Sequence, residues 1–199
     1  MPNANSPLLR VVAIGASAGG LIALRKLVGA LPSGFAAAVL VVLHLYPTVP
    51  SRLAWLLARS GSLPVWPATD AEPIKGGTIY VAVPDRHLLV EDRRIRLALS
   101  SPVHHVRPSV DRLFTSMAAA YGPECAAMVL SGTGVDGAQG LAAVRRAGGI
   151  TIAQDVNEAQ FRGMPGAAIA TGCVDHVLDV ASIASLLLRL AAVPAGASA

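Results

Sequence analysis

An apolar run that ends in a turn of small residues constrains the fold of this chain more than any other stretch. Residues 8–14 are rich in leucine, valine and isoleucine, which is typical of a strand buried on both faces of a parallel sheet. The run stops at Gly15-Ala16-Ser17-Ala18-Gly19-Gly20, and a helical pattern begins at Leu21. We therefore expect a strand, a tight turn and a helix, which together form the repeating unit of an α/β fold.

The same alternation continues along the chain. Further strands are predicted at 37–43, 63–66, 78–82, 126–130 and 150–153. Helices are predicted at 20–31, 51–60, 109–120, 137–147, just before Ala170, and at 181–190. Residues 87–90 and 95–98 flank a charged turn and predict a hairpin. The fold class expected is α/β, a three-layer, doubly wound, mostly parallel sheet with an appended antiparallel β-hairpin.

The length of 199 residues indicates one domain, which we place at 8–190 between a flexible N-terminus (1–7) and a flexible C-terminal tail (191–199). No apolar run approaches the length of a membrane span, and no secretory signal opens the chain. Cys125 and Cys173 lie in apolar stretches without C-x-x-C spacing, so both are expected to be buried in a reducing compartment. These features predict a cytoplasmic protein without membrane insertion.

The net charge of +4 invites a nucleic-acid hypothesis. The positive residues are scattered in the sequence, however, and the few aromatic residues are not interleaved with them as a stacking platform requires. We therefore predict attraction to an acidic protein partner rather than to nucleic acid.

The turn at Ser17 fits the G-x-S-x-G pattern of a nucleophile elbow. A serine on such a turn stands clear of the core, next to backbone N–H groups and a helix N-terminus that can stabilise an oxyanion. The same turn is also how α/β folds build anion sites, and Ser17 could simply cap the helix. The motif alone leaves both interpretations open.

Two more polar residues follow predicted strands. His44 ends the strand at 37–43, and Asp136 follows the strand at 126–130. Taken singly, His44 could be a core histidine and Asp136 an N-cap of the helix beginning at Gly137. A serine needs a histidine to take its proton, and the histidine needs a carboxylate to orient it. Since ligands bind at the carboxyl ends of parallel strands, the three residues together favour a catalytic triad.

The main rival is a non-catalytic module that binds a nucleotide or a signalling partner. Residues 132–137 fit G-x-G-x-x-G between a strand and a helix, and Asp155 follows the next strand. Asp136 inside that turn would repel a pyrophosphate, and the first glycine-rich turn has Ser17 where the fingerprint needs a glycine.

Many of these motifs occur in the same order in one family. From about Val11 to Leu190 the chain resembles the catalytic domain of CheB-type chemotaxis protein-glutamate methylesterases. The resemblance rests on the stretches at 14–20, 42–44, 77–82, 107–111, 132–137, 147–155 and 163–165. It implies hydrolysis of γ-glutamyl methyl esters on the cytoplasmic helices of chemoreceptors, and deamidation of glutamine in some relatives.

The resemblance also assigns roles. It implies Ser17 as nucleophile, His44 as general base and Asp136 as orienting group. It further implies that the backbone N–H groups of Ala18 and Thr133 would bind the oxyanion. The resemblance implies no metal or organic cofactor.

The remaining expectations concern the surroundings of the triad and its regulation. Met164 and Arg107 are candidates for the substrate cleft, although Arg107 and Asp111 could instead fix a helix start. His104 and His105 are expected to be a solvated pair, since no ligand spacing accompanies them. Family members usually carry a receiver domain ahead of the catalytic domain. Few residues precede the first strand here, so we expect regulation by a separate receiver-domain protein, no regulation, or a fragment of a longer chain.

Overall fold

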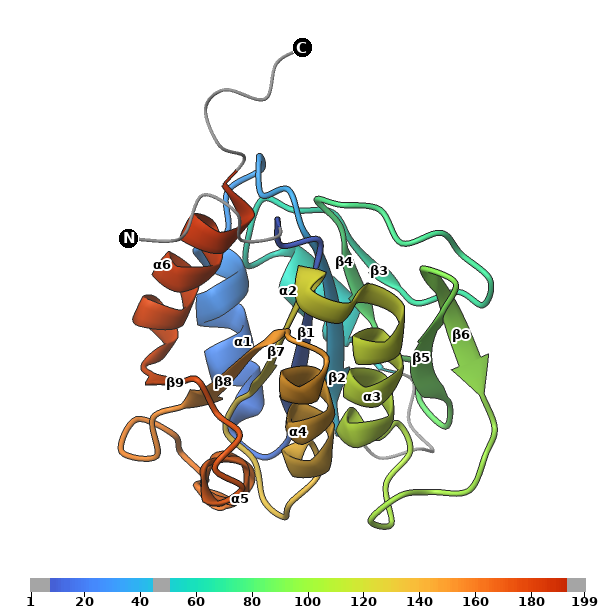
Figure 1. Ribbon diagram of the computed structural model, residues 1–199. Helices are drawn as coiled ribbons and strands as arrows, with labels where there is room; N and C mark the ends of the chain where they lie inside the picture. Colours follow the sequence, from blue (N-terminus) through green and yellow to red (C-terminus); the bar gives the residue numbers. More distant parts are fainter. Residues whose placement is uncertain (1–7, 45–50, 193–199) are drawn as a thin grey trace.

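A seven-stranded parallel sheet forms the centre of the molecule (Figure 1). The computed structural model describes residues 8–44 and 51–192. In chain order the strands of this sheet are β1 (Val11–Ala16), β2 (Ala38–Leu43), β3 (Val65–Pro67), β4 (Ile79–Val81), β7 (Cys125–Val129), β8 (Ile150–Gln154) and β9 (His176–Leu178). Their spatial order is β3-β4-β2-β1-β7-β8-β9, and every neighbouring pair is parallel. β5 (His87–Glu91) and β6 (Arg94–Ala98) form a separate antiparallel pair.

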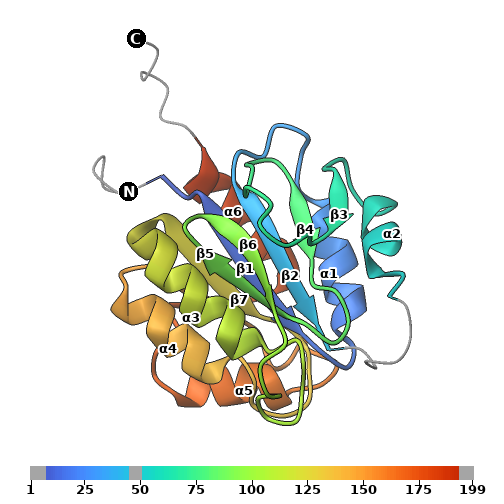
Figure 2. The same ribbon diagram turned by 90° about the vertical axis from the view of Figure 1, so that its right-hand side faces the viewer.

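Helices cover both faces of the sheet (Figures 1 and 2). One face carries α1 (Gly20–Gly29), α2 (Leu53–Ala58) and α6 (Val180–Ala191). The other carries α3 (Val110–Tyr121), α4 (Ala138–Arg146) and α5 (Gly163–Ala170), with the β5–β6 hairpin beside α3. The predicted three-layer, doubly wound architecture with an appended hairpin is confirmed.

The period of two along each strand divides the core into two halves. In β1, Val12 and Ile14 pack with α1, α2 and α6, whereas Val11 and Ala13 pack with α3 and α4. Because both faces are covered, all six residues of β1 are buried. This burial explains why the strand reads as a continuous apolar run rather than as an alternating one.

The direction in which the chain adds successive strands to the sheet reverses between the neighbouring strands β1 and β7. From β1 it runs through α1 to β2 on one side, and from β7 it runs through α4 to β8 on the other. The carboxyl ends of β1 and β7 therefore flank a topological switch point, where open α/β sheets bind ligands. The turns that carry Ser17 and Asp136 lie there.

The structure corrects a few details of the sequence prediction. β9 was not predicted, because this short edge strand is largely exposed and its three residues show no apolar run. Cys125 is buried, and burial raises the pKa of its thiol to about 12. Cys173 was expected to be buried as well, but it is only half-buried, in the turn that leads to β9. The predicted N-terminal segment 1–7 and most of the predicted tail lie outside the described residues.

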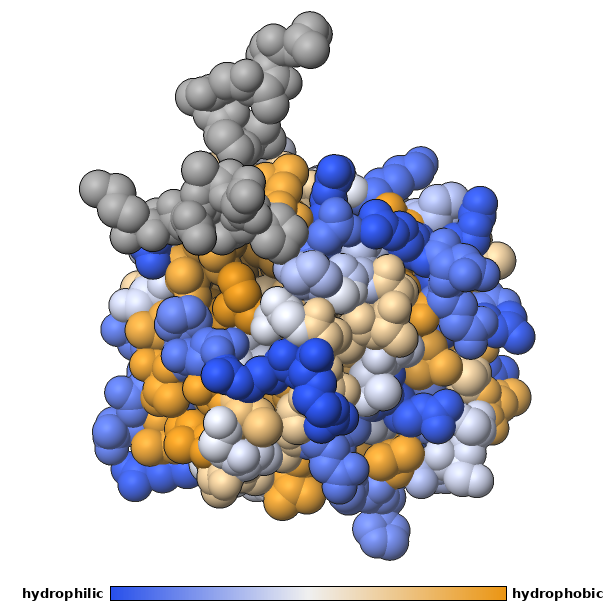
Figure 3. Space-filling model, viewed as in Figure 1, coloured by the Kyte–Doolittle hydropathy of each residue, from blue (hydrophilic) through white to orange (hydrophobic). Residues whose placement is uncertain are grey.

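The surface seen in Figure 3 is uneven in character. Hydrophilic side chains predominate on the side of the β5–β6 hairpin, and hydrophobic ones gather over α6. Exposed Val177 and Leu188 belong to β9 and α6. Within residues 8–44 and 51–192, no helix combines the length and the hydrophobicity needed to span a bilayer.

Candidate active site

Ser17 sits on a tight turn between β1 and α1. Its N–H donates to the carbonyl of Ser131 at 3.0 Å, and its own carbonyl accepts the N–H of Gly20 at 2.9 Å. Gly19 has a φ of +72°, in the left-handed region that glycine adopts without strain. The turn thus holds Ser17 half-buried at the N-terminal end of α1, as the elbow motif predicted.

His44 lies beside this turn because β2 pairs with β1. Its N–H donates to the carbonyl of Ala16 at 3.0 Å, so the residues that follow the two strands are neighbours. The side chain is 12% exposed, and its Nε2 lies 2.9 Å from Oδ2 of Asp136. In the described part of the chain, no hydrogen bond joins the Ser17 hydroxyl to His44. With Nε2 engaged by Asp136, Nδ1 is the ring nitrogen left to receive a proton from Ser17.

Asp136 is 3% exposed and accepts four hydrogen bonds. Oδ1 accepts from the Ser109 hydroxyl at 2.9 Å and the Asp111 N–H at 3.0 Å, and Oδ2 accepts from the Val110 N–H at 2.7 Å and from His44. Burial by itself would raise the pKa of Asp136, but these donors outweigh it and hold the pKa below its usual range. Asp136 therefore stays ionised, as a group that orients a histidine must.

The capping of α4 differs from the interpretation that Asp136 alone suggests, whereas α3 starts as predicted, with Ser109 as its N-cap. Asp136 does not cap α4, whose N-cap Gly137 has no side-chain cap of its own. Asp111 supplies that function from α3: its Oδ1 accepts the N–H groups of Gly137 at 2.9 Å and Gly140 at 2.7 Å. Burial, together with the adjacent Asp136 carboxylate, raises the pKa of Asp111.

His104 is exposed, as predicted, and it also contacts a buried carboxylate that the sequence did not indicate. Its Nε2 lies 3.3 Å from Oδ2 of Asp111, a buried oxygen without a hydrogen bond in the described residues. His104, Asp111 and Asp136 bring ligand-type atoms within 4.8 Å of one another. Because Asp136 already accepts four donors, this group offers a metal ion fewer free lone pairs than its composition suggests. A separation of seven residues between His104 and Asp111 across a loop gave no signal for the pairing.

Glycines allow the helices to approach this site. A Cβ at Gly15 would overlap the Val110 side chain, and one at Gly137 would lie 2.9 Å from Val110 Cγ1. The first glycine of the elbow motif is therefore required by the start of α3, whose N–H groups hold Asp136. The backbone of Gly15 itself is ordinary strand.

The turn after β7 forms the opposite side of the site. A Cβ at Gly132 would lie 2.9 Å from Cβ of Ser17 and would overlap the sulfur of Met164, so Gly132 is packed closely against both residues. Met164 is 1% exposed and its N–H donates to the carbonyl of Gly132 at 2.9 Å. In the described part of the chain, the N–H groups of Ala18 and Thr133 donate to no backbone acceptor. They stay candidates for oxyanion donors.

Arg107 and His87 fix the loop that precedes α3. The Arg107 guanidinium donates to Oδ1 of Asp85 and to the carbonyl of Ser100, so its contact with substrate remains a prediction. His87 is fully buried: Nδ1 accepts the Ser109 N–H at 3.1 Å, and Nε2 donates to the Ser101 carbonyl at 3.1 Å. Burial lowers the pKa of His87.

Known proteins share this combination of fold and motifs. Residues 12–187 match the CheB methylesterase family. The chain belongs to the CheB methylesterase family. It is 40% identical, over 94% of its length and 55% of the relative's, to "Protein-glutamate methylesterase/protein-glutamine glutaminase 2" of Anaeromyxobacter dehalogenans. It is 34% identical, over 90% of its length and 93% of the relative's, to "Putative protein-glutamate methylesterase/protein-glutamine glutaminase" of Leptospira interrogans.

A solved structure of the CheB methylesterase family has the same fold. The crystal structure of the Thermotoga maritima CheB methylesterase catalytic domain aligns with a TM-score of 0.87 at 34% identity, covering 92% of this chain and 98% of that one. The chain spans about half the length of the first curated CheB relatives that it matches.

The geometry of this CheB domain disfavours the nucleotide alternative. The N-terminal N–H groups of α4, which would bind a pyrophosphate, are already occupied by the Asp111 carboxylate. Gly132, the first glycine of the fingerprint, donates to the carbonyl of Phe161.

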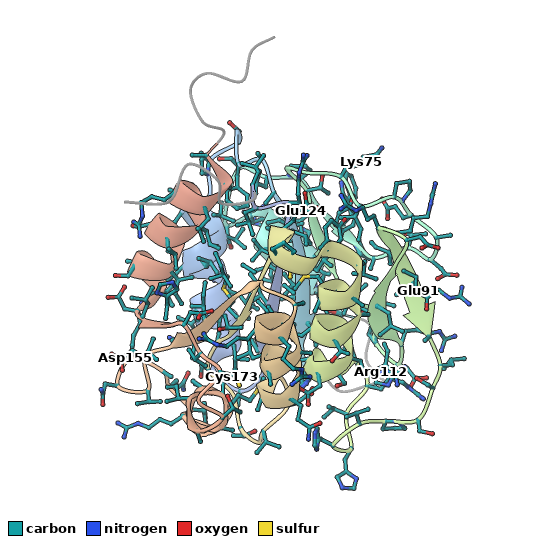
Figure 4. The ribbon with its side chains drawn as sticks, in the orientation of Figure 1. Lys75, Glu91, Arg112, Glu124, Asp155 and Cys173 are labelled. Atoms are coloured by element: carbon teal, nitrogen blue, oxygen red, sulfur yellow. The ribbon has the colours of Figure 1, made fainter. Side chains whose placement is uncertain are left out.

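Figure 4 labels Arg112 in the first turn of α3 and Asp155 after β8, both toward the lower edge, where the strands end. Charges of both signs therefore border this edge.

Proposed function

We propose that this protein is a serine hydrolase that removes methyl esters from glutamate side chains on the cytoplasmic helices of chemoreceptors. The observation that carries the proposal is the 2.9 Å contact between His44 and the ionised Asp136, beside the Ser17 turn, in a chain of the CheB methylesterase family. A methyl ester of glutamate is neutral and small, and its carbonyl carbon is open to attack by a hydroxyl held clear of the core.

In the first half of the reaction, Nδ1 of His44 takes the hydroxyl proton as Ser17 Oγ attacks the ester carbonyl carbon. The Asp136 carboxylate stabilises the imidazolium that forms. The N–H groups of Ala18 and Thr133 receive the negative charge of the tetrahedral oxygen. His44 then returns the proton to the methoxy oxygen, and methanol leaves an acyl-enzyme on Ser17.

In the second half, His44 removes a proton from water as the water oxygen attacks the acyl carbon. The bond to Ser17 Oγ breaks and the serine oxygen recovers the proton from His44. The products are a glutamate carboxylate on the substrate and free enzyme. Every proton transfer uses the same ring nitrogen, which Asp136 aims through its bond to Nε2.

Deamidation of glutamine is a second activity that the same site supports. The relatives from Anaeromyxobacter dehalogenans and Leptospira interrogans carry both activities in their names. A glutamine side chain would yield the same acyl-enzyme, with ammonia leaving in place of methanol. We propose the two substrates for one triad, with His44 protonating either leaving group.

The partners follow from this reaction. We propose methylated chemoreceptors as substrates, a separate receiver-domain protein as a regulator, and a cytoplasmic location where both are found. The proposed chemistry requires no metal or organic cofactor. Met164 and Arg107 are proposed to border the bound side chain.

The test is the release of methanol from membranes that carry methylated chemoreceptors. The wild-type protein is expected to release methanol, and Ser17→Ala is expected to release none above background. Ser182→Ala, a serine in the first turn of α6, is the matched control and should retain wild-type release. Release that persists in Ser17→Ala would exclude Ser17 as the nucleophile.

A further inference from the structure

The charges of this chain are divided unequally along the sequence. All 12 acidic residues lie at or after Asp70, so the first 69 residues contain lysine and arginine but no aspartate or glutamate. Those 69 residues include β1, α1, β2 and α2. The first 69 residues therefore carry positively charged side chains but no negatively charged ones.

Two helices gather this charge on one surface. α1 and α2 lie side by side in Figure 2, and Arg25 Nε donates to Oγ of Ser60 at 3.1 Å across their junction. A shallow groove runs between them. We call this region the α1–α2 surface; its exposed residues are Ile22, Arg25, Lys26, Arg52, Trp55 and Arg59.

The four cations of the α1–α2 surface lack acidic partners. Among the described residues none of the four forms an ion pair, and the residues outside that range include no aspartate or glutamate. Elsewhere in the described residues the pattern is mixed: Arg93, Arg96 and Arg145 are each paired with a carboxylate, whereas Arg94, Arg146 and Arg189 are unpaired but lie apart on different elements. Unpaired charge concentrated on one face attracts a partner of opposite sign and accelerates its association.

Trp55 gives this surface an apolar anchor. Its side chain is 52% exposed, with the guanidinium carbons of Arg52 and Arg59 over the ring at 5.0 and 5.2 Å from its centroid. The spacing of three and four residues places all three on one helical face. Tryptophan and arginine are the residue types that most often dominate protein interfaces. Because arginines already lie over the ring, it is poorly placed to stack on a nucleic-acid base.

The α1–α2 surface begins next to the proposed nucleophile. Ile22 lies in the first turn of α1, and a second small pocket places it beside Gly19 and Ser131, which belong to the turns around Ser17. At 1.5 Å of rise per residue, Lys26 is roughly 9 Å along α1 from its start at Gly20. A protein segment with one side chain at Ser17 would thus extend over this surface.

We propose that the α1–α2 surface binds a carboxylate-rich segment of the protein substrate and so holds its esterified glutamate at Ser17. This inference rests on the proposed function, because a substrate with several modifiable glutamates carries free carboxylates beside the ester. Each turnover adds one more carboxylate to that segment. The bound partner is an acidic protein surface, and the cations set its affinity while the triad performs the chemistry.

The test measures binding separately from catalysis. In a Ser17→Ala background, Lys26, Arg52 and Arg59 are changed together to glutamine, and affinity for a purified cytoplasmic fragment of a chemoreceptor is measured at low and at physiological salt. The matched control changes Arg94, Arg146 and Arg189 to glutamine, which removes the same charge from other exposed positions. We expect the α1–α2 variant to lose about tenfold or more in affinity, mostly at low salt, while the control stays within about twofold. Thermal denaturation of both variants confirms that they are folded.

Three results would overturn the proposal: equal binding by the α1–α2 variant and its parent, an equal loss in the control, or tighter binding of a single-stranded oligonucleotide than of the receptor fragment. A failure of the proposed function is recognised separately, as absence of methanol release by the wild-type protein. In a background with Ser17 intact, the α1–α2 variant is expected to raise KM for the methylated fragment with little change in kcat. A fall in kcat alone would contradict a docking role.

Discussion

Asp136 and Asp111 cap each other's helices: Asp136 caps α3, which contains Asp111, and Asp111 caps α4, which Asp136 precedes. Asp136, just before α4, accepts the first N–H groups of α3, and Asp111, in the first turn of α3, accepts those of Gly137 and Gly140 at the start of α4. The carboxylate that orients His44 is therefore fixed by two helix ends that depend on each other. Loss of either cap should disturb both the stability of the α3–α4 pair and the position of His44.

Replacing Asp111 tests this reciprocal capping. Asp111→Ala leaves the N–H groups of Gly137 and Gly140 without their acceptor, and we expect the free energy of unfolding to fall by about 1–2 kcal/mol. Asp111→Asn keeps an acceptor oxygen and should recover most of that loss. Urea denaturation measures both variants. An Asp111→Ala protein as stable as wild type would show that the caps contribute little.

Asp136→Asn is expected to act mainly on catalysis. An amide accepts fewer hydrogen bonds than a carboxylate and cannot stabilise the His44 imidazolium, so kcat should fall by about 10³–10⁴-fold. Asp155→Asn is the matched control, since Asp155 lies at the same edge of the sheet but, among residues 8–44 and 51–192, its side chain accepts only the Asn157 N–H of its own loop. Methanol release per enzyme is the measurement. A loss below about tenfold would contradict the orienting role of Asp136.

Gly15→Ala tests the approach of α3 to β1. The added methyl group would overlap Val110, and overpacking of this kind destabilises a protein by about 1–3 kcal/mol. In a Val110→Ala background the two closest contacts, with Cγ1 and Cγ2, disappear and a 3.1 Å contact with Cβ remains, so the same change should cost much less. Gly34→Ala is the control, because a Cβ there meets no atom within 4 Å. Equal costs of Gly15→Ala in both backgrounds would exclude Val110 as the cause.

His87 makes a pH-dependent contribution to stability. Burial lowers its pKa from 6.5, so below pH 6.5 the unfolded chain binds a proton that the folded chain resists. Its contribution is complete above pH 6.5 and is lost as the pH falls toward the lowered pKa. His87→Gln should flatten the dependence of the unfolding free energy on pH in that window, whereas His176→Gln, at an exposed position, should not. An unchanged slope in His87→Gln would contradict this assignment.

The sequence predicted those features of the fold and of the site that are local or that follow from burial. The strand at 37–43 is recognisable because both of its faces are covered, and strand ends converge in any parallel sheet, which brought Ser17, His44 and Asp136 to one edge. The sequence could not predict hydrogen-bond partners that are brought together by long-range packing. Asp136 takes its donors from α3, 25 to 27 residues away, rather than from the helix it precedes.

Surface features show the same limit. The positive residues are scattered along the sequence, but the packing of α1 against α2 brings four of them together around Trp55. The pairing of His104 with Asp111 likewise depends on how the loop before α3 folds back. Neither arrangement has a spacing that periodicity detects.

Covalent labelling with a fluorophosphonate, followed by peptide mapping, tests the central claim most directly. The account predicts a single phosphonyl adduct on Ser17, formed much more slowly in His44→Gln and at the wild-type rate in Ser182→Ala. The adduct on Ser17 would establish an activated nucleophile at the edge where β1 and β2 end. Absence of labelling, or labelling at another serine with Ser17 unmodified, would contradict the account.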